Sequence, residues 1–187
     1  MKIGILAVQG AFIEHENMLS SLGAECVELR KKADISDDLD GLVLPGGEST
    51  VQGKLLNELD MFNILKDKIK SGLPVMATCA GLILLSETLS NDDRRYFQTL
   101  PVTTRRNAYG RQLGSFKRTS NIEGIGNFEM VFIRAPYIEA VSDDVEVLAS
   151  VDDHITAVRY KNQLGLTFHP EIADDARLHQ YFLSMIE

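Results

Sequence analysis

One cysteine stands where a nucleophile could act. Cys79 lies in the run Ala77-Thr78-Cys79-Ala80-Gly81, between an apolar segment typical of a buried strand and another typical of a helix. Small residues around it fit the tight strand-to-helix turn that exposes a nucleophile at the carboxyl edge of a sheet. The adjoining helix N-terminus would favour the thiolate. A buried structural cysteine is an equally good interpretation of Cys79 alone, because free cysteine is among the most buried residue types.

A histidine and a glutamate could provide the base that such a nucleophile needs. They occur in Phe168-His169-Pro170-Glu171, directly after a strand-like segment. Proline biases the preceding residue toward extended geometry, so the side chains of His169 and Glu171 can project to similar sides. A histidine oriented by a carboxylate is the base that a cysteine nucleophile requires. Alone, the pair could be a loop histidine beside a solvated glutamate, but together with Cys79 it predicts a Cys-His-Glu triad.

A glycine-rich loop could supply hydrogen-bond donors to the same reaction. Residues 44–49, Leu-Pro-Gly-Gly-Glu-Ser, follow a third apolar segment. Paired glycines let main-chain N–H groups approach a ligand, and acyl transfer needs such donors for the developing oxyanion. Glu48 and Ser49 could equally cap the next helix. A phosphate loop is disfavoured, because no Gly-Lys-Ser/Thr follows.

Composition excludes several classes of protein. The chain has 187 residues, of which 44% are hydrophobic, enough for the core of one domain over residues 1–187. Its 27 acidic and 19 basic residues give a net charge of −8, which disfavours nucleic acid as a partner. Two cysteines are too few for a disulfide framework and poorly spaced for zinc, and we expect no metal site. No apolar run approaches the roughly 20 residues of a membrane span, and the chain enters a strand at once, so we expect a cytoplasmic protein.

The first half of the chain alternates between strand-like and helix-like segments. Short apolar runs predict strands over residues 2–8, 24–29, 41–44 and 74–78. Apolar residues at helical spacing predict helices over residues 12–22, 55–69 and 82–85. The second of these could be one helix or two that divide near Asp60. Such alternation predicts an α/β fold in which a parallel sheet has helices on both faces.

The second half has strand-like segments with no long helix between them. These segments are residues 97–104, 113–118, 128–134, 145–151, 155–160 and 164–168. We therefore expect antiparallel hairpins there, and an apolar stripe over residues 178–186 predicts a closing helix. His15, His154 and His179 have no evident partners in the sequence, so we interpret them as structural or surface residues. Cys26 falls in a predicted strand and is interpreted as a core residue.

The three motifs, in this order, resemble those of the triad glutamine amidotransferases, also called class I glutaminases. Several segments narrow the resemblance to the glutaminase subunits of pyridoxal 5′-phosphate synthase, in the deoxyxylulose-independent pathway to vitamin B6. They are residues 8–10, 44–50, 78–82, 106–112, 132–136 and 168–171. The resemblance runs through nearly the whole chain. One departure is Ala77, which stands two residues before the cysteine where this family usually has glycine.

The resemblance implies a fold and a set of site residues. The fold would be a three-layer α/β sandwich of the flavodoxin-like type, with a mixed, largely parallel central sheet. Cys79 would be the nucleophile, His169 the general base and acid, and Glu171 the orienting carboxylate. The oxyanion hole would consist of the N–H groups of Gly47 and Ala80. The residues that match the family's glutamine-binding positions are Gly47, Glu48, Ser49, Arg106, Ile133 and Arg134.

These glutamine-binding positions make chemical sense. An arginine can meet the α-carboxylate of glutamine, while Glu48 and backbone carbonyls can receive the α-ammonium group. Taken in isolation, however, Arg106 and Arg134 would be interpreted as partners in surface salt bridges.

The implied reaction is hydrolysis of L-glutamine to L-glutamate and ammonia through a γ-glutamyl thioester, without a cofactor. The ammonia would pass to a separate (β/α)₈ synthase subunit, which combines it with a pentose phosphate and a triose phosphate. The isolated chain is expected to be a poor glutaminase that its partner activates through the Gly46-Gly47 peptide. Two alternatives stay open: a glutaminase subunit of another amidotransferase, such as imidazole glycerol phosphate synthase, and a non-catalytic flavodoxin-like interaction protein.

Overall fold

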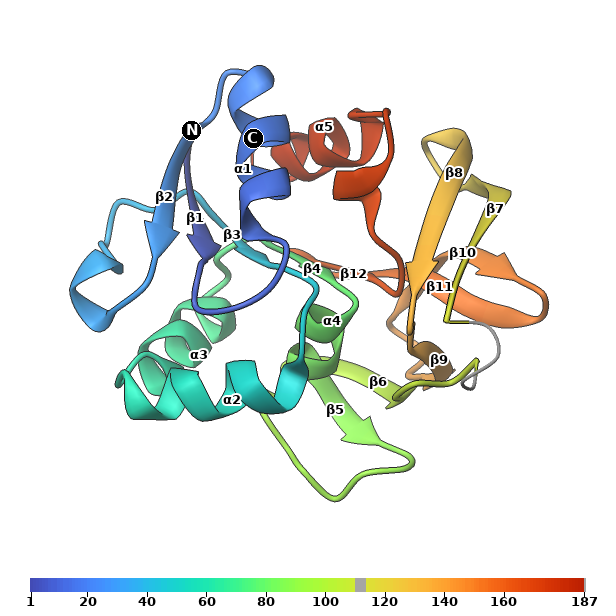
Figure 1. Ribbon diagram of the computed structural model, residues 1–187, viewed down its shortest axis with the longest axis horizontal. Coiled ribbons are helices and arrows are strands. Elements are labelled where there is room, and N and C mark those ends of the chain that lie inside the picture. Colours follow the sequence, from blue (N-terminus) through green and yellow to red (C-terminus); the bar gives the residue numbers. More distant parts are fainter. Residues whose placement is uncertain (110–113, 187) are drawn as a thin grey trace.

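Within residues 1–109 and 114–186, which the computed structural model describes, the chain folds around a ten-stranded sheet with helices on both faces (Figure 1). The strands of this sheet are β1 (Lys2–Leu6), β2 (Glu25–Leu29), β3 (Gly41–Leu44), β4 (Val75–Thr78), β5 (Ser86–Leu89), β6 (Leu100–Arg105), β9 (Tyr137–Val141), β10 (Glu146–Val151), β11 (His154–Tyr160) and β12 (Gln163–Leu166). A separate hairpin consists of β7 (Ser115–Ile122) and β8 (Gly126–Ile133).

The sheet is mixed, and its parallel part comes mainly from the first half of the chain. The strand order is β2-β1-β3-β4-β12-β11-β9-β6-β5, with β10 paired to β11. Neighbours from β2 to β12 are parallel, whereas β11 is antiparallel to β12, β9 and β10. The prediction of a mixed, largely parallel sheet is confirmed. Its central strands β3, β4 and β12 end at the same edge, so the loops that follow them meet there.

The helices form the two outer layers of the three-layer arrangement. α1 (Phe12–Ser21) and α5 (Arg177–Ser184) cover one face, and α2 (Ser49–Glu58), α3 (Phe62–Lys70) and α4 (Ala80–Leu85) cover the other (Figure 1). Two short 3₁₀ turns, η1 (Lys32–Asp34) and η2 (Pro170–Ile172), lie in connections.

Alternating side chains of the central strands supply both cores. In β3, Leu42 and Leu44 pack with the helices of the second layer, and Val43 packs with Leu19 and Phe182 of the first. All five side chains are fully buried. This is the period-2 pattern of a strand that is covered on both faces.

The structure also corrects parts of the prediction. The predicted helix over residues 55–69 is two helices, and Asp60 between them has φ 54°. β5 and β9 were not predicted. The expectation of antiparallel pairing in the second half holds for β7–β8 and β10–β11–β12, but β12 is parallel to β4 and β5 is parallel to β6. Leu113, the predicted start of a strand, and motif residues 110–112 lie outside the described residues.

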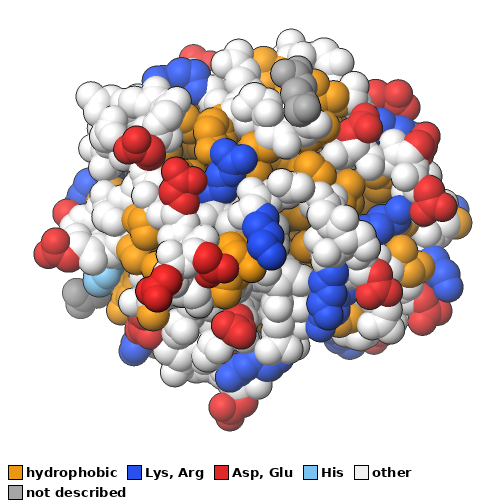
Figure 2. Space-filling model, turned by 180° about the vertical axis from the view of Figure 1, so that it is seen from behind, with side chains coloured by type: hydrophobic (Ala, Val, Ile, Leu, Met, Phe, Trp, Pro, Cys, Tyr) orange, Lys and Arg blue, Asp and Glu red, His pale blue; other side chains and the backbone are white. Residues whose placement is uncertain are grey.

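Two further findings concern the described part of the chain as a whole. It contains no helix that is long and apolar enough to cross a membrane. Nor does it hold a group of three or more His, Cys, Asp or Glu side chains placed to bind a metal ion. On the face shown in Figure 2, acidic and basic side chains are interspersed, with hydrophobic side chains visible between them.

Candidate active site

Cys79 lies at the carboxyl end of β4, in the sharp turn that leads into α4. Its backbone angles, φ 47° and ψ −100°, fall in a region that residues with a side chain rarely adopt. The Cys79 N–H donates to the carbonyl oxygen of Leu166 over 2.8 Å, which ties the turn to β12. Gly81 approaches β3 so closely that a Cβ atom there would lie 2.0 Å from the carbonyl oxygen of Leu44. The predicted tight turn is therefore present, and glycine at position 81 permits it.

Alanine at position 77 is compatible with this turn. Ala77 is fully buried in the core on the side of α2 and α3. It pairs with Leu44 of β3 and with Gly165 of β12, in regular parallel register. The departure from the glycine that is usual at this position thus leaves the turn intact.

His169 follows β12, the strand beside β4, so it reaches the same edge of the sheet as Cys79. Its Nδ1 lies 2.6 Å from Glu171 Oε1, and the two side chains are 8% and 0% exposed. Burial lowers the pKa of His169, but contacts with Cys79 and Glu171 outweigh burial and raise it to about 10. Burial raises the pKa of Glu171, but His15 and His169 outweigh that effect and hold it below its usual range. Both shifts favour a carboxylate–imidazolium pair beside Cys79.

The glycine loop between β3 and α2 lines the same pocket as Cys79. The Gly46 carbonyl oxygen accepts a hydrogen bond from the Ala11 N–H over 2.9 Å. Because the peptide bond is trans, the Gly47 N–H points away from Ala11. Within residues 1–109 and 114–186, no protein acceptor takes the N–H of Gly47 or of Ala80. These two donors, the ones predicted for an oxyanion hole, are available to a ligand.

A pocket of about 340 Å³ opens beside Cys79. It is lined by Gln9, Gly47, Glu48, Ser49, Cys79, Ile83, Arg106, Asn107, Ile133 and Arg134. The structure thus brings all the predicted glutamine-binding residues together around the cysteine. Gln9, Ile83 and Asn107 were not predicted as site residues. Gln9 and Asn107 lie in motif segments, but Ile83 has no signal beyond its place one turn after the cysteine.

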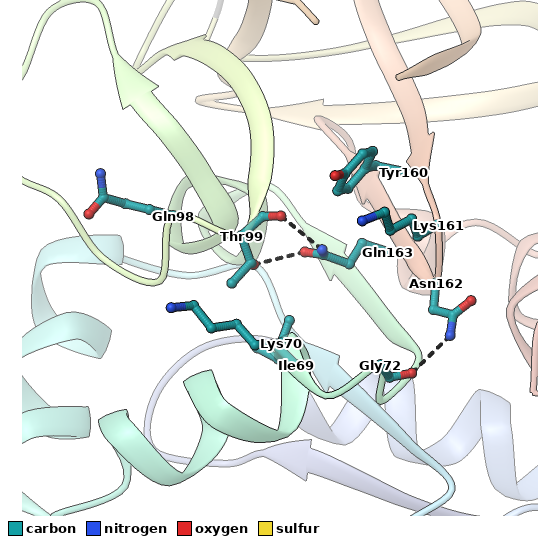
Figure 3. A pocket seen from close by; sticks show the side chains of 9 residues that line it. All are labelled: Ile69, Lys70, Gly72, Gln98, Thr99, Tyr160, Lys161, Asn162 and Gln163. Carbon is teal, nitrogen blue, oxygen red and sulfur yellow. Dashed lines mark hydrogen bonds between the residues drawn. The ribbon is translucent and has the colours of Figure 1, made fainter. Parts of the chain in front are cut away.

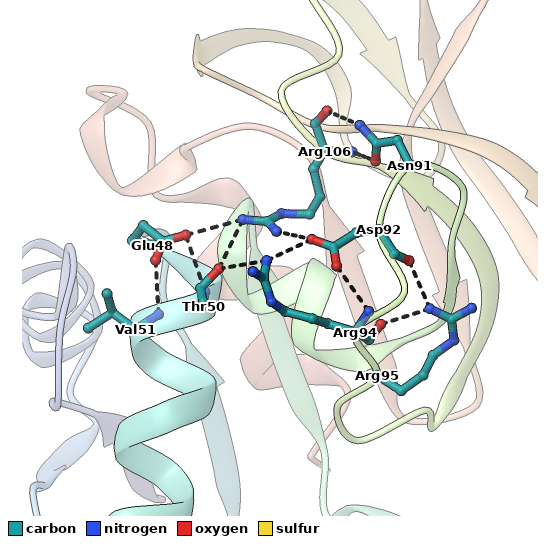
Figure 4. A network of polar contacts seen from close by, with 8 residues as sticks. All are labelled: Glu48, Thr50, Val51, Asn91, Asp92, Arg94, Arg95 and Arg106. Atoms are coloured by element: carbon teal, nitrogen blue, oxygen red, sulfur yellow. Dashed lines mark hydrogen bonds and ion pairs between the residues drawn. The ribbon is translucent and has the colours of Figure 1, made fainter.

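Arg106 reaches this pocket from the segment after β6 and sits in a network of ion pairs (Figure 4). Its guanidinium contacts Asp92, and it also lies 3.2 Å from Glu48 Oε1 and 3.3 Å from Thr50 Oγ1. Glu48 caps α2 as well, because its carboxylate accepts hydrogen bonds from the N–H groups of Thr50 and Val51. Glu48 is therefore both a helix cap and a pocket residue, and Arg106 is both a salt-bridge partner and a pocket residue.

Ile133, the last residue of β8, and Arg134, the residue that follows it, also line the pocket. Arg134 has φ 43°, and its N–H donates to the Gly114 carbonyl oxygen over 2.7 Å. This turn leaves the Ile133 carbonyl oxygen 4.0 Å from Cys79 Sγ. Among the described residues, no carboxylate pairs with the Arg134 guanidinium, in contrast to Arg106. A carbonyl oxygen therefore lies beside the thiol, and Arg134 adds a positive charge to the lining of the same pocket.

The remaining histidines differ from one another, and the expectation that none has a partner is wrong for two of them. His15 and His179 are fully buried, with His15 Nδ1 2.9 Å from His179 Nε2. His15 Nε2 lies 3.3 Å from Glu171 Oε2, so this ring reaches the carboxylate behind His169. The sequence could have indicated this role for His15, because it is a polar residue on the buried face of α1. His154 instead stacks on Tyr137, with ring centroids 4.0 Å apart.

A second pocket, of about 310 Å³, lies at the other end of β4, among the residues that follow α3 and β11 (Figure 3). Several of its polar side chains are hydrogen-bonded within the protein. Gln163 bonds both the hydroxyl and the carbonyl oxygen of Thr99, and Asn162 donates to the Gly72 carbonyl oxygen. It is lined by no cysteine, histidine or carboxylate, so the pocket beside Cys79 is the better candidate active site.

That site combines a thiol, an imidazole held by a carboxylate, and two available N–H donors. These are the groups needed to cleave an amide through a covalent thioester. Residues 5–187 match the SNO glutamine amidotransferase family. The chain belongs to this family. Membership confirms the predicted enzyme class and gives no support to the alternative of a non-catalytic interaction protein.

Relatives of this SNO family member share one name, pyridoxal 5′-phosphate synthase subunit PdxT. A protein of Desulfitobacterium hafniense (strain DSM 10664 / DCB-2) is 63% identical over 186 residues, covering 100% of this chain and 94% of its own. A protein of Methanocorpusculum labreanum is 53% identical, covering 100% and 98%. One of Streptococcus pneumoniae (strain CGSP14) is 52% identical, covering 99% and 97%.

Solved structures support the same fold for this family member. A crystal structure described as a glutamine amidotransferase superposes with a TM-score of 0.93 at 40% identity, covering 98% of both chains. A putative GMP synthase subunit of Thermoplasma acidophilum superposes with a TM-score of 0.69 at 19% identity, covering 100% of this chain and 94% of its own. The second likeness concerns the fold alone.

Proposed function

We propose that this chain is the glutaminase subunit of a pyridoxal 5′-phosphate synthase, acting in the cytoplasm as one domain over residues 1–187. It hydrolyses L-glutamine to L-glutamate and ammonia, and the ammonia serves vitamin B6 biosynthesis. The observation that carries the proposal is 63% identity, over the whole chain, to a protein named as a subunit of that synthase. The pocket beside Cys79 supports it with matching chemistry.

In the proposed mechanism, His169 holds the proton of the Cys79 thiol, and the thiolate Sγ attacks the side-chain amide carbon of glutamine. The carbonyl oxygen becomes an oxyanion that the N–H groups of Gly47 and Ala80 stabilise. His169 gives a proton to the leaving nitrogen, which departs as ammonia and leaves a γ-glutamyl thioester. A water molecule then attacks the thioester carbon and gives a proton to His169, so that glutamate and the thiolate are released. Glu171 holds the imidazole and stabilises its charged form.

The pocket walls would orient the other end of glutamine. The guanidinium of Arg134, which pairs with no carboxylate among the described residues, meets the α-carboxylate. Glu48 and the Ile133 carbonyl oxygen receive the α-ammonium group. Arg106 holds Glu48 in place through their 3.2 Å contact and adds positive charge at the rim. Ser49 closes the pocket at the start of α2.

The proposed partner is a (β/α)₈ synthase subunit that takes up the ammonia and joins it to a pentose phosphate and a triose phosphate. The direct test supplies glutamine labelled with ¹⁵N in its amide to this chain and the purified synthase subunit of the same organism. The label should appear in pyridoxal 5′-phosphate, and Cys79→Ala should prevent its transfer while free ammonium still supports the synthase.

Two outcomes would contradict the proposal. One is the absence of glutamate release in the presence of the synthase subunit. The other is transfer of the label only with a different acceptor, such as the cyclase of imidazole glycerol phosphate synthase. The second outcome would keep the glutaminase chemistry and replace the partner.

A further inference from the structure

His15 lies behind the proposed triad, on the buried face of α1. Its ring is fully buried, and its Nε2 faces two groups of the site. One is Glu171 Oε2, at 3.3 Å, and the other is the hydroxyl oxygen of Thr78, at 3.2 Å. Thr78 immediately precedes Cys79, so a single imidazole contacts both the carboxylate of the triad and the strand that carries the nucleophile.

The second oxygen of Glu171 depends on this contact. Oε1 is taken by His169, whereas Oε2 is buried and has no hydrogen-bond partner of regular geometry among the described residues. The structure places His15 Nε2 3.3 Å from it. A buried carboxylate oxygen without any donor is costly, so a proton on this nitrogen stabilises the ionised glutamate.

The surroundings determine which nitrogen of His15 carries the proton. If Nδ1 carried it, the lone pair of Nε2 would face the carboxylate across 3.3 Å, which is repulsive. With the proton on Nε2, Nδ1 accepts a hydrogen bond from His179 Nε2 over 2.9 Å. The proton donors then run in one direction, from His179 to His15 to Glu171, with His169 donating to the other oxygen of the carboxylate.

Both outer rings are held neutral. Burial lowers the pKa of His15, although Glu171 and, more weakly, Glu14 act in the opposite sense, and His169 adds to the lowering. Burial, reinforced by His15, lowers the pKa of His179 to about 3. A neutral His15 places its Nε2 3.3 Å from Glu171 Oε2 and leaves the charge of the carboxylate in place, which His169 needs.

We propose that His15 is a positioning residue of the triad, whose Nε2–H is shared between Glu171 and Thr78 and fixes the carboxylate against His169. This inference rests on the proposed function. Without the donor, the carboxylate of Glu171 can rotate away from His169 or take up a proton. The charged form of His169 is then less stabilised. The rate of thioester formation should fall, while glutamine binding in the pocket beside Cys79 is unchanged.

The test compares His15→Met with His15→Gln, two side chains of similar length. Glutamine can present an N–H where Nε2 stands, and methionine cannot. With the synthase subunit present, His15→Met should lower kcat about ten- to a hundredfold, as removal of the outer partner of a metal-bound histidine does. The KM for glutamine should stay within about twofold, because ground-state binding is untouched. His15→Gln should recover most of the loss, and His154→Gln serves as a histidine control outside the site.

A second readout does not depend on glutamine. In a Cys26→Ala background, iodoacetamide alkylates Cys79 at a rate that reports the thiol–imidazole pair. His15→Met should slow alkylation near neutral pH and move its pH profile toward alkaline pH, and His15→Gln should restore the profile. If the parent protein does not hydrolyse glutamine, the alkylation comparison still tests the positioning role of His15. Failure of the proposed function can therefore be distinguished from failure of this inference.

Three results would overturn the inference. The first is a parental kcat and alkylation profile in His15→Met. The second is equal loss in the methionine and glutamine variants, which would show that the ring only fills space. If His15→Met does not fold, ¹⁵N NMR of histidine-labelled parent protein decides instead. A proton on Nδ1 of His15 would contradict the proposed hydrogen bond, and a proton on Nε2 would support it.

Discussion

The imidazole of His169 lies directly against the backbone of Gly46. A Cβ atom at residue 46 would sit 2.2 Å from His169 Cε1, well inside any real contact. The absence of a side chain therefore lets the glycine loop and the histidine come together at the carboxyl edge of the sheet. The loop thus contributes this close approach to the site, besides the N–H donor that the proposed mechanism assigns to it.

Gly46→Ala should displace His169 or the loop and lower glutaminase activity by at least about a hundredfold, the loss expected when one oxyanion donor or the base is misplaced. The measurement is glutamate release in the presence of the synthase subunit, together with thermal unfolding. Gly23→Ala is the control, because a Cβ there meets nothing within 4 Å although φ is 87°. It should lose about 1 kcal/mol of stability and keep its activity. Parental activity in Gly46→Ala would refute the close-contact argument.

Cys79→Ala should abolish hydrolysis without unfolding the protein, since loss of a triad nucleophile costs on the order of 10⁶ in rate. Cys79 adopts φ 47°, which strains any residue with a side chain. Cys79→Gly should therefore be inactive and about 1 kcal/mol more stable than Cys79→Ala in urea unfolding. If the Cys79→Gly variant were less stable than the Cys79→Ala variant, packing of the side chain, and not backbone strain, would dominate at this position.

The strands and turns next to the motifs could be predicted because their patterns are local. Strands β3 and β4 are fully buried apolar runs, and the residues after them are contiguous in sequence. β5 was missed because its four residues, Ser86–Leu89, include exposed and partly exposed polar side chains, and its strand geometry comes from pairing with β6. The contact of His15 with Glu171 joins distant parts of the chain, so no local pattern indicated it.

Acid should destabilise the fold through its buried histidines. Burial is the main reason that folding lowers the pKa of His179 from its ordinary value of 6.5 to about 3. Below about pH 6.5 the unfolded chain binds a proton there that the folded chain excludes, so stability falls as pH falls. The free energy of unfolding should change by about 1.4 kcal/mol per pH unit for each such histidine.

Urea unfolding between neutral and mildly acidic pH measures this slope. The His179→Leu variant should have a shallower slope than the parent and than the His154→Gln variant. An identical slope in the leucine variant would contradict the assignment.

Arg134→Ala should impair the use of glutamine while leaving the chemistry of Cys79 intact. Its guanidinium pairs with no carboxylate among the described residues and lines the pocket. We expect kcat/KM for glutamine to fall about ten- to a hundredfold, as for the loss of a charged hydrogen bond. Alkylation of Cys79 by iodoacetamide, which lacks the amino-acid groups, should stay near the parental rate. Arg105→Ala, which removes an exposed pair with Glu139, is the control. Equal loss of both reactivities would show that Arg134 supports the fold and not the substrate.

The last prediction concerns activation by the synthase subunit. The Gly46 carbonyl oxygen is held by the Ala11 N–H, and that hydrogen bond sets the direction of the Gly47 N–H. Glycines let such a peptide plane turn at low cost, so a partner that binds one orientation better shifts the population toward it. We predict that the orientation held by Ala11 misdirects the Gly47 N–H in the free chain. One misdirected donor costs roughly 10²–10³ in rate, so glutamate release at fixed glutamine should rise by that factor when the synthase subunit is added. Ala11→Pro removes the N–H and should change the ratio between the two rates, while the fully activated rate changes little. Equal rates with and without the subunit would refute a switch at this peptide, and so would an unchanged ratio in Ala11→Pro.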